Sequence, residues 1–188
     1  MIVGLNQVQF GYDDKIILEG IEAVISAGDR IGLIGRNGAG KSTLLKLILG
    51  QYVPDSGEIF RKSGLKVGFL AQNSGLEREN SVYEEMREVF RGVYDCEARM
   101  REIEQRMSKL AHDTQDYREA ESEYNRCVSR FEAMDGYQTE VKIRTVLNGM
   151  GFQGRYDSVI SHMSGGEKTR LALAKLLLEQ LDLLILDE

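Results

Sequence analysis

A glycine-rich stretch between an apolar run and a helical segment constrains the fold of this chain more than any other feature. Residues 35–42 read GRNGAGKS, directly after the apolar run RIGLI and before a segment with helical spacing that ends at Gly50. Glycines there let the backbone adopt conformations closed to other residues and let N–H groups approach a bound group. The order strand, glycine-rich loop and helix (about 42–49) predicts an α/β fold.

The same loop carries the side chains that phosphate chemistry requires. Residues 35–42 match every fixed position of the pattern G-x-x-x-x-G-K-[ST]. Lys41 can reach the β- and γ-phosphates of a nucleotide, and the Ser42 hydroxyl can bind Mg²⁺. The helix N-terminus adds positive potential at the same place. We therefore predict a nucleotide site that comprises Gly35, Arg36, Asn37, Gly38, Ala39, Gly40, Lys41, Ser42 and Thr43.

Two carboxylates follow an apolar run at the end of the sequence, LDLLILDE. Leu183–Leu186 have the pattern of a strand that is covered on both faces of a parallel sheet. Open α/β sheets place ligands at the carboxyl ends of such strands. Asp187 is expected to hold Mg²⁺ through water, and Glu188 to act as a general base or to orient the attacking water. An exposed helix end would explain this stretch about as well if it stood alone.

A third stretch, SGGEKTR at 164–170, opens an amphipathic helix over about 165–179. Ser164, Gly165 and Gly166 would form a helix N-terminus with free N–H groups, which is a second device for binding an anion. By itself this stretch would be only a capped turn. A further helix is expected at about 138–149, and a strand at 65–71.

The middle of the chain has a different period, because apolar residues recur at alternating intervals of four and three. The first series is Val82, Met86, Val89, Val93, Cys96, Met100, Ile103, Met107 and Leu110. The second is Tyr117, Ala120, Tyr124, Cys127, Phe131 and Met134. The break between them predicts an antiparallel helical hairpin over 81–135, with Cys96 near Phe131 and Cys127 near Met100. The cysteines are then apolar fillers rather than partners in a disulfide.

Composition limits the classes of function. The chain has 188 residues and a net charge of −6, which does not support a broad nucleic-acid surface. Residues 81–135 hold nine basic and fourteen acidic side chains, although a few arginines at one end could suffice because salt screens distant charges. No apolar run reaches the ~18 residues of a membrane span, and no signal peptide is evident. A cytoplasmic setting is expected, and the cysteine spacing disfavours a zinc site.

The three stretches, in this order, resemble the ATP-binding cassette (ABC) family over essentially the whole chain. The resemblance implies ATP and Mg²⁺ as ligands. It also implies that Tyr12 stacks on adenine and that Gln72, in the Q-loop, touches Mg²⁺ or the water. Ser164 and Gly166 would contact the γ-phosphate held by a second cassette in a head-to-tail pair. The implied fold is an ABC-type nucleotide-binding domain of the P-loop NTPase class.

Within that family, SGGEKTRLALAKLLL and FEAMDGYQTEVKIRTVLNGMGF (131–152) look more like the ABC-F subfamily than like transporter cassettes. Members of that subfamily carry two cassettes in one chain and act on the ribosome in translation or antibiotic resistance. The resemblance implies an ABC core at 1–80, a helical arm at 81–136 that reaches ribosome or tRNA, and a signature helix with the Walker B strand at 137–188. No membrane insertion is implied.

Three alternatives stay open at this point. The chain could be the ATPase subunit of a membrane transporter, or a coiled-coil interaction module on a P-loop scaffold. The hairpin could also be only an elaborated helical subdomain. Because the sequence ends directly after the Walker B carboxylates, we expect a piece of a longer two-cassette protein, truncated at Walker B and lacking the second cassette. Such a piece should bind ATP but hydrolyse it poorly, and should leave an unpaired strand edge at Leu183–Leu186.

Overall fold

The computed structural model of the chain describes residues 1–13, 15–70, 76 and 79–187. The predicted site residues Gln72 and Glu188 lie outside the described residues. The chain divides into two compact units, Met1–Asn73 with Gln180–Glu188, and Ser74–Glu179. Each unit has its own hydrophobic core.

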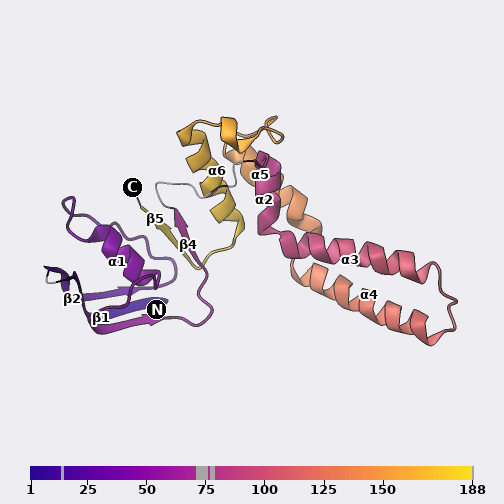
Figure 1. The fold of residues 1–188 in the computed structure, drawn as a ribbon, viewed down its shortest axis with the longest axis horizontal. Coiled ribbons are helices and arrows are strands. Elements are labelled where there is room, and N and C mark those ends of the chain that lie inside the picture. Colours follow the sequence, from indigo (N-terminus) through magenta and orange to yellow (C-terminus); the bar gives the residue numbers. More distant parts are fainter. Residues whose placement is uncertain (14, 71–75, 77–78, 188) are drawn as a thin grey trace. The chain divides into compact units, whose positions relative to one another are not determined.

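The first unit contains a three-stranded antiparallel sheet with the order β2-β1-β3 (Figure 1). Its strands are β1 (Val3–Tyr12), β2 (Lys15–Ile25) and β3 (Ser56–Arg61). The sequence analysis did not anticipate β3, because SGEIFR is short and has little apolar alternation. Gly57 in β3 has a φ of 81°, and a Cβ there would lie 2.2 Å from the carbonyl oxygen of Gln7. The irregular register between β1 and β3 therefore requires glycine at this position.

A helix and a parallel strand pair complete the first unit. Helix α1 (Lys41–Ile48) buries Leu47 and Ile48 against the apolar side chains of β1. Strands β4 (Val67–Leu70) and β5 (Leu183–Leu186) pair in parallel, and Ile185 joins the same core. Arg61 holds the end of α1, since its guanidinium donates to the carbonyl oxygens of Leu47 and Ile48. The predicted α/β class is confirmed, as are the helix near 42–49 and the strand near 65–71.

The predicted strand RIGLI, however, does not form. Residues 30–34 have no ladder partner among the described residues. Their apolar side chains are exposed, most of all Ile34, at 95%. A strand needs a neighbour for its backbone hydrogen bonds, and apolar composition alone does not supply one.

The expectation that Leu183–Leu186 are covered on both faces is also wrong. Successive side chains of a strand point to opposite faces. In β5, Ile185 is buried, whereas Leu184 and Leu186 are 38% and 59% exposed. Within the part of the chain that the structure describes, β5 has β4 as its single strand neighbour.

The second unit is helical, and its larger core lies between three helices. Helices α2 (Val82–Val89), α5 (Thr139–Gly149) and α6 (Gly165–Leu178) contribute Met86, Leu147 and Leu171 to it. Two short 3₁₀ turns, η1 (Gly136–Gln138) and η2 (Ile160–His162), connect these helices to the rest of the unit. Helices α5 and α6 confirm the predicted segments at about 138–149 and 165–179.

Helices α3 (Arg91–Met107) and α4 (Gln115–Ala133) pack against each other as an antiparallel pair (Figure 1). Cys96 and Phe131 are buried together in a small cluster at one end of this pair. Both cysteines are free. Within the described residues, no helix is long and apolar enough to cross a membrane.

The first apolar series does not form one continuous helix, because the chain breaks at Phe90 between α2 and α3. Phe90 has φ −106° and ψ 21°, outside the helical region. The two parts of the series pack against different partners: Val82 and Met86 enter the core with α5 and α6, whereas Val93 and Cys96 contact Phe131. A heptad period indicates which side chains of a helix are buried, but it does not indicate which other helix they pack against.

Candidate nucleotide-binding site

The glycine-rich loop runs directly into helix α1, and its conformation depends on two glycines. Gly40 caps the helix with φ 91°, and Gly38 has φ 79°. Gly35 has no positive φ, and a Cβ there would make an ordinary contact of 3.6 Å with Ala39. The expectation that the conformation at Gly35 excludes other residues is therefore wrong.

The Lys41 ammonium is placed by the loop itself. Its Nζ donates to the carbonyl oxygens of Gly35 and Arg36 at 2.8 and 3.2 Å. The loop is further closed by a hydrogen bond from the Ala39 N–H to the carbonyl of Arg36. Residues 36–39 are exposed, so the backbone of the loop is accessible from solvent beside the half-buried Lys41. This combination suits a phosphate anion.

The first turn of α1 and the end of β5 meet beside the loop. The Ser42 hydroxyl lies 3.4 Å from Oδ1 of Asp187. Asp187 is held in place by its own N–H, which donates to the carbonyl of Leu70 on the neighbouring strand β4. A hydroxyl and a carboxylate next to a phosphate-binding loop form the oxygen donor set that Mg²⁺ prefers. The residues present thus fit Mg²⁺ with a triphosphate. Thr43 follows in α1 and is half-buried.

Alanine at Gly40 is expected to lower the free energy of unfolding by at least about 2 kcal/mol, because the left-handed conformation costs an L residue about 1–2 kcal/mol. The new Cβ would also lie 2.8 and 2.9 Å from side-chain atoms of Ile17 and Leu18. Gly38→Ala is the matched control, since a Cβ there has no atom within 4 Å, and it should cost only about 1 kcal/mol. Urea unfolding of both variants measures the difference. Equal losses would contradict this account of Gly40.

Tyr12 ends strand β1 within an aromatic cluster. Its ring lies edge-on to Phe10 and Tyr52, with centroid distances of 5.1 and 6.1 Å, and is 45% exposed. Hydrogen bonds from Tyr12 and then from Lys46 lower the pKa of the Tyr52 hydroxyl. Tyr12 faces Lys15 at the end of the β1–β2 pair. Two residues after Lys15, the side chain of Ile17 lies 2.8 Å from where a Cβ at Gly40 would be. An exposed, positioned aromatic ring near the loop could stack on a base.

In the second unit, Ser164 caps helix α6 through a reciprocal pair of hydrogen bonds with Glu167. The Ser164 hydroxyl accepts from the Glu167 N–H, and the Glu167 carboxylate accepts from the Ser164 N–H at 2.8 Å. Arg155 reaches the same carboxylate at 2.5 Å. The Arg155 guanidinium and then the Ser164 groups hold the pKa of Glu167 at about 2. This capping box (Ser164, Glu167) with Arg155 fixes the start of α6.

The depressed pKa of Glu167 predicts how this cap responds to acid. The ionised Glu167 carboxylate contributes to the free energy of unfolding. This contribution is complete above the ordinary glutamate pKa of about 4.3 and is lost as the pH falls through about 2. A titration of the Glu167 carboxyl carbon by NMR should therefore show a midpoint well below the other glutamates. Arg155→Met should move that midpoint upward. A midpoint near 4.3 in the folded wild type would contradict the assigned hydrogen bonds.

Gly165 and Gly166 follow the cap and are exposed. A Cβ at either position would meet no described atom within 4 Å, and neither residue has a positive φ. Within the part of the chain that the structure describes, no packing contact or backbone conformation requires glycine at these two positions.

One charged group that the sequence analysis missed lies in the helical core. Glu85 on α2 is fully buried, and its two oxygens accept from Lys175 on α6 and from Asn80, at 2.5 and 3.0 Å. The sequence held a signal for it, since Glu85 stands three residues after Val82 on the apolar stripe of α2. Charged residues are rarely buried unless they are paired. The partner of Glu85 is Lys175, which is 90 residues away in the sequence.

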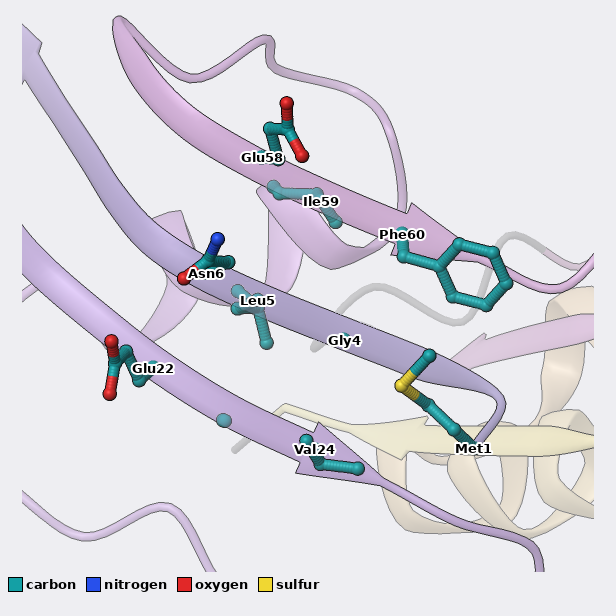
Figure 2. A pocket seen from close by; sticks show the side chains of 10 residues that line it. Met1, Gly4, Leu5, Asn6, Glu22, Val24, Glu58, Ile59 and Phe60 are labelled. Carbon is teal, nitrogen blue, oxygen red and sulfur yellow. The ribbon is translucent and has the colours of Figure 1, made fainter.

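A separate hollow lies on the antiparallel sheet of the first unit. It has a volume of about 880 Å³, and Figure 2 shows side chains of β1, β2 and β3 around it together with Met1. Met1, Val24 and Phe60 give it an apolar side, and Glu22 and Glu58 an acidic one. It contains none of the loop residues and no cationic side chain, so it does not suit a nucleotide.

The glycine-rich loop leads into helix α1, and the Asp187 carboxylate, which follows the parallel strand β5, lies beside Ser42. This arrangement defines a P-loop nucleotide-binding domain. The family model described as ABC transporter matches residues 18–188. The chain therefore belongs to the ABC family, as its sequence motifs suggested, and its cassette is an ABC ATPase domain.

Curated relatives span the whole chain. YdiF of Bacillus subtilis is 43% identical over 189 residues, which are 100% of this chain and 29% of that protein. The tylosin resistance ATP-binding protein TlrC of Streptomyces fradiae is 36% identical, with 99% of this chain and 34% of that protein aligned. ABC transporter F family member 5 of Arabidopsis thaliana is 29% identical, with 99% and 27% aligned. The chain thus spans about a third of the length of these relatives.

Among solved structures, CbiO1 of Clostridium perfringens, part of the ABC transporter complex CbiONQ, superposes with a TM-score of 0.64 at 23% identity. The match covers 100% of this chain and 65% of that one. At this identity the likeness supports the fold, which confirms the predicted ABC-type nucleotide-binding domain.

Proposed function

We propose that the chain is an ATP-binding and ATP-hydrolysing cassette of an ABC-F type protein that acts on the ribosome, in translation or antibiotic resistance. The observation that carries the nucleotide half of this proposal is the approach of the Ser42 hydroxyl and the Asp187 carboxylate beside the loop, at 3.4 Å. The observation that supports action on the ribosome is the helical pair α3–α4. It lies in the sequence between the Q-loop region and the signature helix.

Each site residue has a role in this proposal. The N–H groups of the loop and the Lys41 ammonium bind the β- and γ-phosphates, and Tyr12 stacks on adenine. Ser42, Asp187 and Gln72 hold Mg²⁺, which neutralises charge on the phosphates when it is bound. Glu188 orients or deprotonates the attacking water.

A second cassette completes the site in this proposal. Ser164, Gly165 and Gly166 of one cassette would approach the γ-phosphate held by the other, in a head-to-tail pair within one longer chain. The open space around both glycines supports this role, because a close approach from outside explains residues that the fold itself does not require. Since hydrolysis then needs both cassettes, residues 1–188 alone should bind ATP and turn it over slowly.

The descriptions of relatives support the ribosomal half. One relative is named for tylosin resistance and another as an F family member, and both align over nearly the whole of this chain, arm included. A cytoplasmic location belongs to the same proposal, because a protein that acts on ribosomes must reach them.

Sedimentation with ribosomes tests the proposal. The full-length protein with Glu188→Gln, which should bind ATP without hydrolysing it, is spun through sucrose with purified ribosomes, with and without ATP. We expect ATP-dependent co-sedimentation that is lost when residues 91–133 are replaced by a short linker. Intact ATP binding with no ribosome association under any condition would contradict the proposal.

The second candidate is the ATPase subunit of a membrane transporter. The family model that matches residues 18–188 is described as ABC transporter, and this is the observation that favours it. It predicts that the protein co-purifies with a membrane-spanning partner and stays in the membrane fraction rather than with ribosomes.

A further inference from the structure

Glu167 divides its two carboxylate oxygens between two partners at the start of α6. Its Oε2 accepts from the N–H and from the hydroxyl of Ser164, at 2.8 and 2.7 Å. Its Oε1 accepts from the Arg155 guanidinium at 2.5 Å. The helix cap thus uses one oxygen and the ion pair uses the other. Because glutamine can take the same place in a capping box, the cap needs neither the charge of Glu167 nor Arg155.

The first backbone N–H groups of α6 remain available. Those of Gly165 and Gly166 donate to no backbone carbonyl among the residues that the structure describes, as is usual in the first turn of a helix. Both residues are exposed. The Ser164 hydroxyl already donates to Glu167, so these two N–H groups are the donors that α6 offers to an anion.

The Glu167 carboxylate opposes the binding of an anion at this place. It lies on the first turn of α6, and Arg155 and then Ser164 hold its pKa at about 2, so it is ionised at neutral pH. Two like charges repel, more strongly where solvent is partly excluded, and the Glu167 side chain is only 20% exposed. The cation that offsets this charge is Arg155, because the adjacent Lys168 donates instead to the carbonyl oxygen of Ser161.

A turn in front of α6 holds Arg155 in place. Its N–H donates to the carbonyl oxygen of Phe152, and its own carbonyl accepts from the N–H of Ser158. Phe152 is buried in the helical core. The carbonyl of Ser158 accepts in turn from the N–H of Val82 at the start of α2. The guanidinium is therefore presented to Glu167 by a backbone that the core fixes.

We infer that Arg155 is a positioning residue for a phosphate anion at the N-terminus of α6. By neutralising Glu167, it allows the N–H groups of Gly165 and Gly166 to bind the terminal phosphate of a nucleotide that another cassette holds. Arg155 acts through Glu167 and does not touch the phosphate itself. The inference deepens the proposed function and rests on its head-to-tail pairing of two cassettes.

The test measures how well the full-length protein distinguishes the non-hydrolysable ATP analogue AMP-PNP from ADP, which lacks the terminal phosphate. Both nucleotides are titrated with Mg²⁺ by calorimetry. All proteins carry Lys41→Met, which weakens the cassette's own site, so the titration reports mainly the site that this α6 would complete. Arg99→Met is the matched control for Arg155→Met. The two arginine side chains are 48% and 46% exposed, and each pairs with a glutamate at 2.5 Å.

We expect Arg155→Met to weaken the binding of AMP-PNP about tenfold and that of ADP less than about twofold. Arg99→Met should leave both affinities within about twofold of the parent protein. Arg155→Lys should recover most of the loss, because it restores the positive charge. The double variant Arg155→Met with Glu167→Gln should return to within about threefold, since the neutral amide keeps the cap and needs no counter-charge. Added salt should shrink the loss in Arg155→Met, because salt screens the repulsion.

Two results would overturn the inference directly. A double variant as weak as Arg155→Met would mean that Arg155 binds the phosphate itself or only supports the fold. Equal losses for AMP-PNP and ADP in Arg155→Met would mean that the terminal phosphate is not involved.

Gly166→Leu separates the inference from the proposed function. A Cβ at Gly166 meets no described atom within 4 Å, so this variant should fold, but its side chain would block the N-terminus of α6. If Gly166→Leu weakens AMP-PNP and Arg155→Met does not, the pairing of cassettes stands and the role of Arg155 is refuted. If neither variant affects AMP-PNP, the pairing fails and the inference fails with it. If only Arg155→Met weakens AMP-PNP, Arg155 acts elsewhere and the inference is again refuted.

Discussion

Replacing Lys175 with methionine should lower the free energy of unfolding of the helical unit by about 3–5 kcal/mol. The Lys175 ammonium is the only cation bonded to the buried Glu85 carboxylate in the described residues, at 2.5 Å. Methionine has a similar volume but no charge, so Glu85, whose side chain is 0% exposed, would keep only its bond to Asn80. A buried charge without a counter-charge is strongly destabilising because it has lost its hydration.

Urea unfolding of three variants, Lys175→Met, Arg170→Met and a double variant, tests this prediction. Arg170→Met changes an exposed cation on the same helix and should cost less than about 0.5 kcal/mol. The double variant Glu85→Gln with Lys175→Met should recover a large part of the loss, because the neutral amide needs no counter-charge. A Lys175→Met loss as small as that of Arg170→Met would show that the ion pair does not hold α2 to α6.

Replacing Lys41 with methionine should raise the dissociation constant of ATP by about 10- to 100-fold. A hydrogen bond to a charged group contributes about 1.5–3 kcal/mol, and each 1.4 kcal/mol is about a tenfold change in affinity. The ammonium is already positioned by the carbonyls of Gly35 and Arg36, so little ordering is needed when a phosphate binds.

Lys62→Met serves as the control for charge, since Lys62 is exposed in the same unit and follows β3. Its ATP affinity should stay within about twofold of the wild type. Fluorescent ATP titrated against all three proteins provides the comparison. Equal affinities for the wild type and Lys41→Met would mean that the loop is not the nucleotide site.

Local sequence signals predicted the parts of the fold that depend on neighbouring residues. The glycine-rich loop, the start of α1 and the start of α6 all follow from caps and turns within a few residues. Ser164 shows this most clearly, because it was predicted to start the helix and does cap α6. The family resemblance added the order of these elements and was confirmed by the family match.

The parts that could not be predicted depend on distant partners. RIGLI looks like a strand, but ladder hydrogen bonds come from another segment, and none of the described residues provides them. The break at Phe90 lies inside an unbroken apolar period, because Met86 and Val93 are buried against different helices. The burial of Glu85 depends on Lys175, which lies 90 residues away in the sequence.

We propose that the loop and Asp187 form one site for ATP with Mg²⁺. The most direct measurement is the affinity for ATP with and without Mg²⁺, by titration calorimetry, in the wild type and in Asp187→Asn. Ser42 and Asp187 lie 3.4 Å apart and are the proposed oxygen ligands. We therefore predict that Mg²⁺ tightens binding in the wild type and that Asp187→Asn loses most of this increase while keeping the Mg²⁺-free affinity. An equal effect of Mg²⁺ in both proteins would contradict the account.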